Sequence, residues 1–260
     1  MSERSIEGYR YFLKDSIRKE LDFSTSDQQR GIPPPEVQKP FRPEQTLIDL
    51  TRPEEFDTSF TISLTQAIKD RKSVRHFSDD PLTLGELSYL LWSTQGLHRM
   101  TGPTVTIRTV PSAGARHAFE TYLYIRNVTG NGAKDGVLLQ EGIYRYLPLT
   151  HQLAFEFEGQ NLSNRVSLAC FNQRFVSGGA VTFFWAAVPY RMEWRYGLAA
   201  HKVIAIDVGH VCQNLYLAVE AIGAGTCGIG AYDQEHLDVL LKLDGEDEFV
   251  VYLAPVGKKP

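Results

Sequence analysis

Three cations and a hydroxyl stand within five residues at positions 71–75, where the sequence reads RKSVR. Guanidinium groups and hydroxyls are the donors that bind phosphate, and Arg71 and Arg75, with Ser73 between them, can supply both. The segment therefore predicts a phosphate-binding site. A solvated helix end is the alternative interpretation, because cations are also favourable near the C-terminus of a helix.

Glycines gather in a second segment, residues 223–228, which reads GAGTCG and matches the pattern GxGxxG. A dinucleotide-binding loop needs a strand before this pattern and a helix that starts inside it. Here a helical pattern precedes the glycines and the next helix signal comes only at Asp233, so that interpretation fails on context. Because glycine has no Cβ, residues 225–230 can instead bring their backbone close to a flat ligand. A flexible transition from helix to loop is the alternative.

Two further segments combine small, aromatic and polar residues. Residues 111–117 read PSAGARH, and such small side chains also let a backbone approach a planar ring. A nucleophilic Ser112 assisted by His117 is the competing interpretation, although no GxSxG pattern surrounds the serine. Residues 193–197 read EWRYG, which predicts a buried aromatic helix start or, through Arg195 and Tyr196, polar groups that line a pocket.

Composition narrows the functional classes. The 260 residues include 27 Lys and Arg against 31 Asp and Glu, a net charge of −4, which argues against a protein that binds nucleic acid non-specifically. No apolar run approaches the ~20 residues that span a bilayer, so no membrane partner is expected. The histidines form no metal-binding spacing, and we expect no metal. Three cysteines without a CxxC pair indicate a reducing, cytoplasmic setting.

Helices and strands that can position these segments are predicted by local signals. Ser63 and Thr83 are N-caps followed three residues later by Gln or Glu, and Asp233 caps a last helix. A longer helix is predicted from about 207 to 222, where Gly223 ends it. Strands are predicted at 121–128, 142–147, 180–188 and 249–256. Because strict βαβ alternation is absent, the predicted fold class is α+β.

The first 60 residues differ from the rest. Six of the 13 prolines fall between Pro33 and Pro53, which predicts an extended arm, and a short amphipathic helix is predicted before it at 9–21. We expect residues 1–60 to form an arm that wraps the domain or a partner subunit, and residues 61–260 to form one domain. A disordered leader is the alternative.

Four segments in this order resemble the FMN-dependent nitroreductase superfamily, and they are most similar to its SagB-type branch, which is related to thiazole- and oxazole-forming peptide dehydrogenases. The segments are 71–96, 111–125, 142–153 and 206–233. The resemblance implies a mainly antiparallel sheet flanked by helices, in a domain-swapped homodimer that holds FMN between its subunits. Helix 207–222 would then be an interface helix.

The resemblance also implies which residues bind the flavin. Arg71, Ser73 and Arg75 would hold the phosphate and ribityl chain, and Lys258 is a further phosphate candidate. The residues that would border the ring are Pro111, Ser112, Ala113 and Gly114, and those at its reactive edge are Gly228, Ile229 and Gly230. The implied activity moves a hydride or electrons to or from a small organic substrate, with NAD(P)H as a candidate donor.

One departure concerns the predicted catalytic pair, Arg195 and Tyr196. Members of the branch that oxidise azolines carry a Lys-Tyr pair here as a proposed base. Arginine is always charged and is a poor base. A general FMN-dependent oxidoreductase is therefore the main expectation, and the alternatives are an azoline dehydrogenase acting on peptides and a flavin-binding module without turnover.

Overall fold

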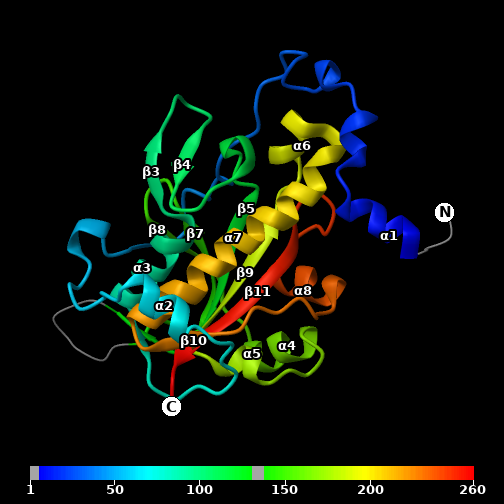
Figure 1. The fold of residues 1–260 in the computed structure, drawn as a ribbon. Helices are drawn as coiled ribbons and strands as arrows, with labels where there is room; N and C mark the ends of the chain where they lie inside the picture. Colours follow the sequence, from blue (N-terminus) through cyan, green and yellow to red (C-terminus); the bar gives the residue numbers. More distant parts are fainter. Residues whose placement is uncertain (1–5, 131–137) are drawn as a thin grey trace.

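The computed structural model describes residues 6–130 and 138–260, which form an α+β fold around a seven-stranded sheet (Figure 1). The strand order is β1-β8-β7-β5-β9-β11-β10, and every neighbouring pair is antiparallel. The strands are β1 (Leu47–Asp49), β5 (Phe119–Ile125), β7 (Gly142–Leu147), β8 (Gln152–Phe157), β9 (Val181–Ala187), β10 (Ala224–Thr226) and β11 (Phe249–Lys258). The predicted α+β class with an antiparallel central sheet is confirmed.

Helices and two small sheets complete the fold. The α-helices are α1 (Ile6–Leu13), α2 (Leu64–Asp70), α3 (Leu84–Gln95), α4 (Leu162–Ala169), α5 (Phe175–Gly178), α6 (Tyr190–Tyr196), α7 (Ala200–Ala221) and α8 (Gln234–Leu241). Short 3-10 helices lie at Ser16–Lys19, Phe23–Thr25, Pro53–Glu55, Ala113–Ala115 and Gly197–Ala199. The small sheets pair β2 (Leu82–Thr83) with β6 (Val128–Thr129) and β3 (Leu97–Met100) with β4 (Thr106–Arg108). Across the described part of the chain, no helix is both long and apolar enough to cross a bilayer.

The predicted N-caps are confirmed. Ser63 Oγ accepts the Gln66 amide at 3.1 Å at the start of α2. Thr83 and Glu86 satisfy each other's backbone amides in a capping box that starts α3. Asp233 accepts the amide of the third helical residue of α8. Each cap satisfies an amide that the first helical turn would otherwise leave unpaired.

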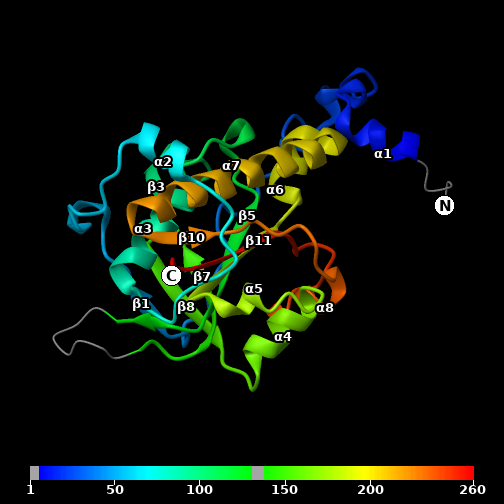
Figure 2. The same ribbon diagram turned by 60° about the horizontal axis from the view of Figure 1, so that its bottom comes forward.

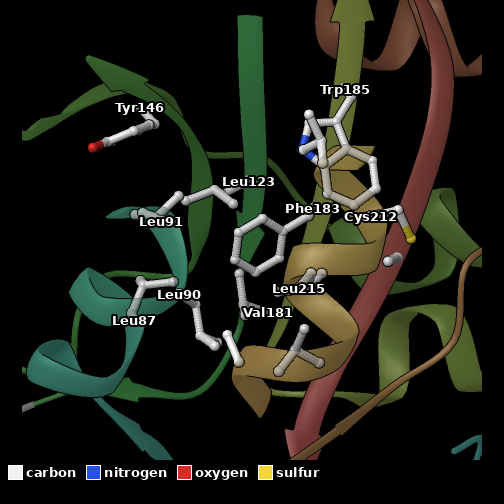
Figure 3. Packing of buried hydrophobic residues seen from close by; sticks show 14 of the residues in the cluster. Leu87, Leu90, Leu91, Leu123, Tyr146, Val181, Phe183, Trp185, Cys212 and Leu215 are labelled. Atoms are coloured by element: carbon white, nitrogen blue, oxygen red, sulfur yellow. The ribbon is translucent and has the colours of Figure 1, made fainter. Parts of the chain in front are cut away.

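Helices cover both faces of the sheet (Figures 1 and 2). α3 and α7 pack on one face, and α4, α5 and α8 pack on the other. Every residue of β9 is buried, because its alternate side chains enter the two cores. Figure 3 shows Phe183 of β9 between leucines of α3 and Leu215 of α7.

Two boundaries differ from the prediction. α7 begins at Ala200 instead of near Asp207, because the preceding residues contain no helix breaker and Asp207 does not act as a cap. The segment after Gly223 is not a loop throughout, since Ala224–Thr226 pair with β11 as the edge strand β10. The predicted helix at 9–21 is also divided, and the whole of α1 lies on the surface without a buried residue.

The proline-rich arm lies along the domain of its own chain, and buried arginines fix it there. Prolines cannot donate a backbone hydrogen bond, but the carbonyls of the arm remain strong acceptors. Three arginines donate to these carbonyls: Arg191 to Glu36, Arg108 to Val37, and Arg145 to Lys39 and Pro40. The three arginines are 5% exposed or less. The arm is therefore held by side chains that a local sequence pattern does not reveal.

A single buried carboxylate balances part of this charge. Glu120 of β5 is 2% exposed and accepts hydrogen bonds from Arg191, from Arg145 and from the Lys39 amide. Burial alone would raise the pKa of Glu120, but the charges of Arg191 and Arg145 outweigh it and lower that pKa. The ionised form of Glu120 therefore contributes to the stability of the folded chain.

We expect Glu120→Gln to lower the free energy of unfolding by about 3–5 kcal/mol at neutral pH, because it leaves the buried Arg191 guanidinium without its carboxylate partner and leaves Arg145 with Glu156 alone. Chemical denaturation measures this change. The folded pKa of Glu120 is lowered, so its stabilisation is present at neutral pH and is lost as the pH falls through that folded value. The difference between wild type and variant should accordingly shrink in acid.

The matched control is Glu44→Gln, which removes an exposed carboxylate of the same arm that lies 3.8 Å from Arg42. Such a surface pair contributes about 0–1 kcal/mol. Equal stabilities of wild type and Glu120→Gln at neutral pH would contradict the role of this carboxylate.

Candidate functional site

The cationic segment 71–75 leaves the end of α2 and runs along the edge strand β10. The Val74 amide donates to the Thr226 carbonyl at 2.9 Å, and Ser73 forms an isolated parallel bridge with Thr226. Val74 fills the space above Gly225, where an added Cβ would lie 2.7 Å from it. This packing fixes the segment and leaves Ser73 and Arg75 exposed.

Tyr216 of α7 joins this segment to the glycine loop. The Arg71 guanidinium lies 5.4 Å from the centroid of the Tyr216 ring, and Ser73 Oγ lies 3.0 Å from its hydroxyl. The same hydroxyl accepts the Gly228 amide at 2.8 Å. Two segments that the sequence predicts as flavin ligands therefore meet at one side chain. Tyr216 itself was not predicted, because a tyrosine on an apolar helix is indistinguishable from a core residue by spacing.

The arginines of the segment are available to an anion. Arg75 stacks 6.0 Å from the Phe175 ring centroid and is exposed. Within residues 6–130 and 138–260, no carboxylate lies within the 4.0 Å of an ion pair from Arg71 or Arg75. Lys258 differs, because its ammonium donates to Glu86 at 2.5 Å and to the Ile222 carbonyl at 2.8 Å. Its charge is already paired within the chain.

The glycine loop offers fewer donors than its three predicted residues suggest. The Gly228 amide is taken by Tyr216, and the Ile229 amide donates to the Leu253 carbonyl at 2.8 Å. The Gly230 amide has no partner among the described residues, and no atom lies within 4 Å of a Cβ built there. Gly230 is thus the residue of this loop with a free donor and open space.

A second group forms on the loop at 111–114. Gly114 has φ +58°, and an added Cβ would lie 2.7 Å from the Tyr196 hydroxyl and 3.1 Å from Arg195 Nε. Only glycine fits this position without strain. The exposed Pro111 and the half-buried Ser112 and Ala113 precede it. The structure therefore brings the predicted ring-bordering loop into contact with the predicted catalytic pair.

Asp207 of α7 holds this loop from the other side. Its carboxylate accepts the Ala113 amide at 3.2 Å and a hydrogen bond from the Ser112 hydroxyl. Burial raises the pKa of Asp207, and these hydrogen bonds partly offset that effect. The sequence pattern placed Asp207 at a helix start, so its role in the loop was missed. Figures 1 and 2 show α7 passing the length of the molecule.

A Ser112–His117 nucleophilic pair is not supported. Ser112 Oγ accepts the backbone amide of His117 at 2.9 Å, whereas the His117 ring hydrogen-bonds the Thr106 backbone. Burial, together with the charge of Arg108, lowers the pKa of His117 to about 3. His117 is a buried structural residue. Among the described residues, no three His, Cys, Asp or Glu side chains gather as a metal site.

The two groups lie on opposite sides of α7. Asp207 and Tyr216 are nine residues apart on this continuous helix. At 3.6 residues per turn, this spacing places them roughly 180° apart around the axis and about 13 Å apart along it. One chain therefore presents segment 71–75 with the glycine loop on one side of α7, and loop 111–114 with Arg195 and Tyr196 on the other.

Known proteins resemble this chain over most of its length. Residues 68–258 match the model of the nitroreductase family. The chain is 32% identical over 198 residues to a protein of Methanocaldococcus jannaschii named as a nitroreductase, which covers 76% of this chain and 92% of that protein. A crystal structure of a nitroreductase from Ralstonia eutropha matches with a TM-score of 0.66 at 25% identity, over 88% of this chain and 94% of that chain.

A more distant structure matches the whole chain. It belongs to the E. coli microcin synthetase McbBCD complex, and it has a TM-score of 0.58 at 17% identity over 100% of this chain and 99% of that chain. A likeness at this identity shows the fold alone.

The close packing behind Gly228 generates a prediction about stability. An added Cβ would lie 2.3 Å from the Tyr252 hydroxyl and 3.2 Å from Cys212 Sγ, so we expect Gly228→Ala to destabilise the chain by about 1–3 kcal/mol. Thermal and denaturant unfolding measure this change. Gly230→Ala, in open space two residues further on, should stay within about 0.5 kcal/mol of wild type. A Gly228→Ala variant as stable as wild type would show that the loop does not pack as described.

Proposed function

The chain belongs to the nitroreductase family, and from this premise we propose that it is an FMN-dependent oxidoreductase that moves a hydride or electrons to or from a small organic substrate. Family membership supports a flavin oxidoreductase in general. The observation that carries the proposal for this chain is the meeting of Arg71, Ser73 and Gly228 at the Tyr216 side chain.

The residues present fit FMN. A phosphate needs cations that are not already paired and hydroxyls that it can reach. Arg71 and Arg75 have no carboxylate partner among the described residues, and the Ser73 hydroxyl, which contacts Tyr216, is exposed. A flat ring needs a backbone that can come close and a donor at its edge. Gly230, with open space and a free amide, meets both needs. In this proposal Gly228 and Ile229 form the backbone at the edge of the ring but do not donate to it, because their amides are already paired. Lys258 does not contact the phosphate, because its ammonium is paired with Glu86.

The placement of segment 71–75 and loop 111–114 on opposite sides of α7 supports a homodimer with two shared sites. Segment 71–75 and loop 111–114 cannot reach one ligand on the same side of that helix within one chain. We therefore propose that loop 111–114 of a second copy completes the site. Leu198, in the 3-10 helix before α7, and Ile206, in the first half of α7, are 64% and 48% exposed, and such apolar surface is stabilised when a second copy covers it.

Bound FMN supplies the redox chemistry, accepting a hydride from one substrate and returning electrons to another. In this proposal Arg195 and Tyr196 line the substrate side of the ring. The Arg195 guanidinium orients an electron-rich substrate group, and the Tyr196 hydroxyl donates a hydrogen bond to it. Asp207 holds loop 111–114 so that both side chains keep their position against Gly114. NADH or NADPH is the proposed electron donor.

A dehydrogenase that oxidises azolines in peptides is the second candidate. The chain from the McbBCD complex, which was solved with truncated pro-MccB17 bound, matches the fold of this chain over its whole length, arm included. Tyr196 is present for such a reaction, but Arg195 replaces the expected lysine. Formation of an azole from a thiazoline-containing peptide by the flavin-loaded protein would support this candidate, and reduction by NAD(P)H without azole formation would favour the first.

The remaining assignments follow the same premise. We propose a cytoplasmic protein, since all three cysteines are free and buried. We also propose that residues 61–260 are the flavin-binding domain and residues 1–60 an arm, because the family match begins at residue 68.

The first test is binding of FMN, followed by reduction. We expect the purified protein to show a bound-flavin absorption spectrum that bleaches with NADH or NADPH under anaerobic conditions. A protein that stays colourless after FMN addition would overturn the proposal. A protein that binds FMN but is not reduced faster than free flavin would instead be a flavin-binding module without turnover.

Arg75→Ala tests the phosphate site. Removing a charge-assisted hydrogen bond should weaken FMN binding about 10- to 100-fold, as measured by calorimetric titration of the flavin-free protein. Lys69→Ala is the control, because it removes an exposed cation from the nearby helix α2 without touching segment 71–75. Unchanged affinity of Arg75→Ala would exclude Arg75 as a phosphate ligand.

A further inference from the structure

The Tyr216 hydroxyl stands between a fixed donor and a hydroxyl that can rotate. The Gly228 amide can only donate, so Tyr216 Oη accepts it at 2.8 Å. Tyr216 then has one hydrogen of its own to place. Among the described residues, Ser73 Oγ at 3.0 Å is the acceptor within reach.

Because Tyr216 accepts from Gly228 and donates to Ser73, the direction of each hydrogen in this series of hydrogen bonds is fixed. When Tyr216 donates to Ser73, the Ser73 hydrogen must point away from Tyr216. Ser73 is exposed and its backbone is fixed by the bridge to Thr226, so its hydrogen is directed outward. Hydrogen bonds in such a series polarise one another, which makes the terminal donor stronger.

Arg71 adds a charge to the same ring. Its guanidinium stacks 5.4 Å from the centroid of Tyr216 and has no carboxylate partner within the parts of the chain that the structure describes. The stacking holds the ring from one side, while the two hydrogen bonds hold its hydroxyl. The outward Ser73 donor and an unpaired cation are thus positioned by one tyrosine.

We propose that Tyr216 is a positioning residue for the phosphate end of the site. Its hydroxyl accepts the Gly228 amide and donates to Ser73 Oγ, and this relay of two hydrogen bonds orients the Ser73 hydrogen toward a phosphate. This inference rests on the proposed function and deepens it, because it assigns the selectivity for FMN over flavins without phosphate to a residue on α7. It also links the glycine loop to the phosphate end, since the same oxygen contacts both.

The test compares the affinities of the flavin-free protein for FMN and for riboflavin, which lacks the phosphate. Tyr216→Phe keeps the ring under Arg71 and removes only the relay. We expect its affinity for FMN to fall about three- to tenfold while its affinity for riboflavin stays at the wild-type value. Ser73→Ala should give the same selective loss, and the double variant should lose no more than either single variant.

Tyr232→Phe is the matched control. The Tyr232 hydroxyl donates to the Val250 carbonyl at 2.9 Å just beyond the same loop, so its removal perturbs packing without touching the relay. The ratio of the two affinities should be unchanged in this variant.

Equal losses for FMN and riboflavin in Tyr216→Phe would overturn the proposal, as would additive losses in the double variant. Because Ser73 is exposed, Ser73→Ala provides the same comparison even if Tyr216→Phe folds poorly. A wild-type protein that binds neither flavin would overturn the proposed function itself, and with it this inference. A wild type that binds FMN while the variants show no selectivity would overturn the inference alone.

Discussion

The rotation of α7 about its own axis is the constraint on which the candidate site depends. Its apolar residues, Val208, Val211, Leu215 and Val219 among them, are buried on the sheet and fix which way every other side chain points. Because that face is buried, Asp207 contacts loop 111–114 and Tyr216 contacts segment 71–75. A rotation of about 100°, equivalent to a shift of one residue, would separate both contacts. The packing of one hydrophobic stripe therefore places the two groups of candidate site residues on opposite sides of α7.

The arm supports the second of these groups, which consists of loop 111–114 with Arg195 and Tyr196. α6 carries Arg191 near its start and the pair Arg195 and Tyr196 at its end. Arg191 donates to the Glu36 carbonyl, and Trp194 Nε1 donates to the Ile32 carbonyl at 2.8 Å, so the arm holds α6 along its length. Glu120 supplies the counter-charge that makes this burial favourable. The proline-rich arm is thus connected, through the buried Arg191 and Glu120, to the helix whose Arg195 and Tyr196 side chains contact Gly114.

Much of the fold could be predicted because its signals are local. The N-caps of α2, α3 and α8 depend on residues three apart, and β9, which is apolar at every position except Thr182, is typical of a central strand. The start of α7 could not be predicted, because Asp207 has the residue type of a cap and its real partner is the distant Ala113 amide. β10 lies where the sequence predicts a loop, because its pairing with β11 and its packing on Val74 are both non-local.

The same difference separates the predicted site residues from those that were missed. Arg71, Ser73 and Gly228 stand in recognisable motifs, whereas Tyr216, which joins them, lies in an apolar helix with no motif of its own. The most direct test of the central claim, a site shared between two copies across α7, is co-expression of two defective chains. One carries Arg71→Ala with Arg75→Ala, and the other carries Gly114→Val. With random pairing, about half of the dimers are mixed, and each mixed dimer regains one intact site. A site shared between two copies gives FMN binding at about a quarter of the wild-type capacity, from variants that bind none alone. No recovery in dimers shown to be mixed would contradict it, because each site would then be built within one chain.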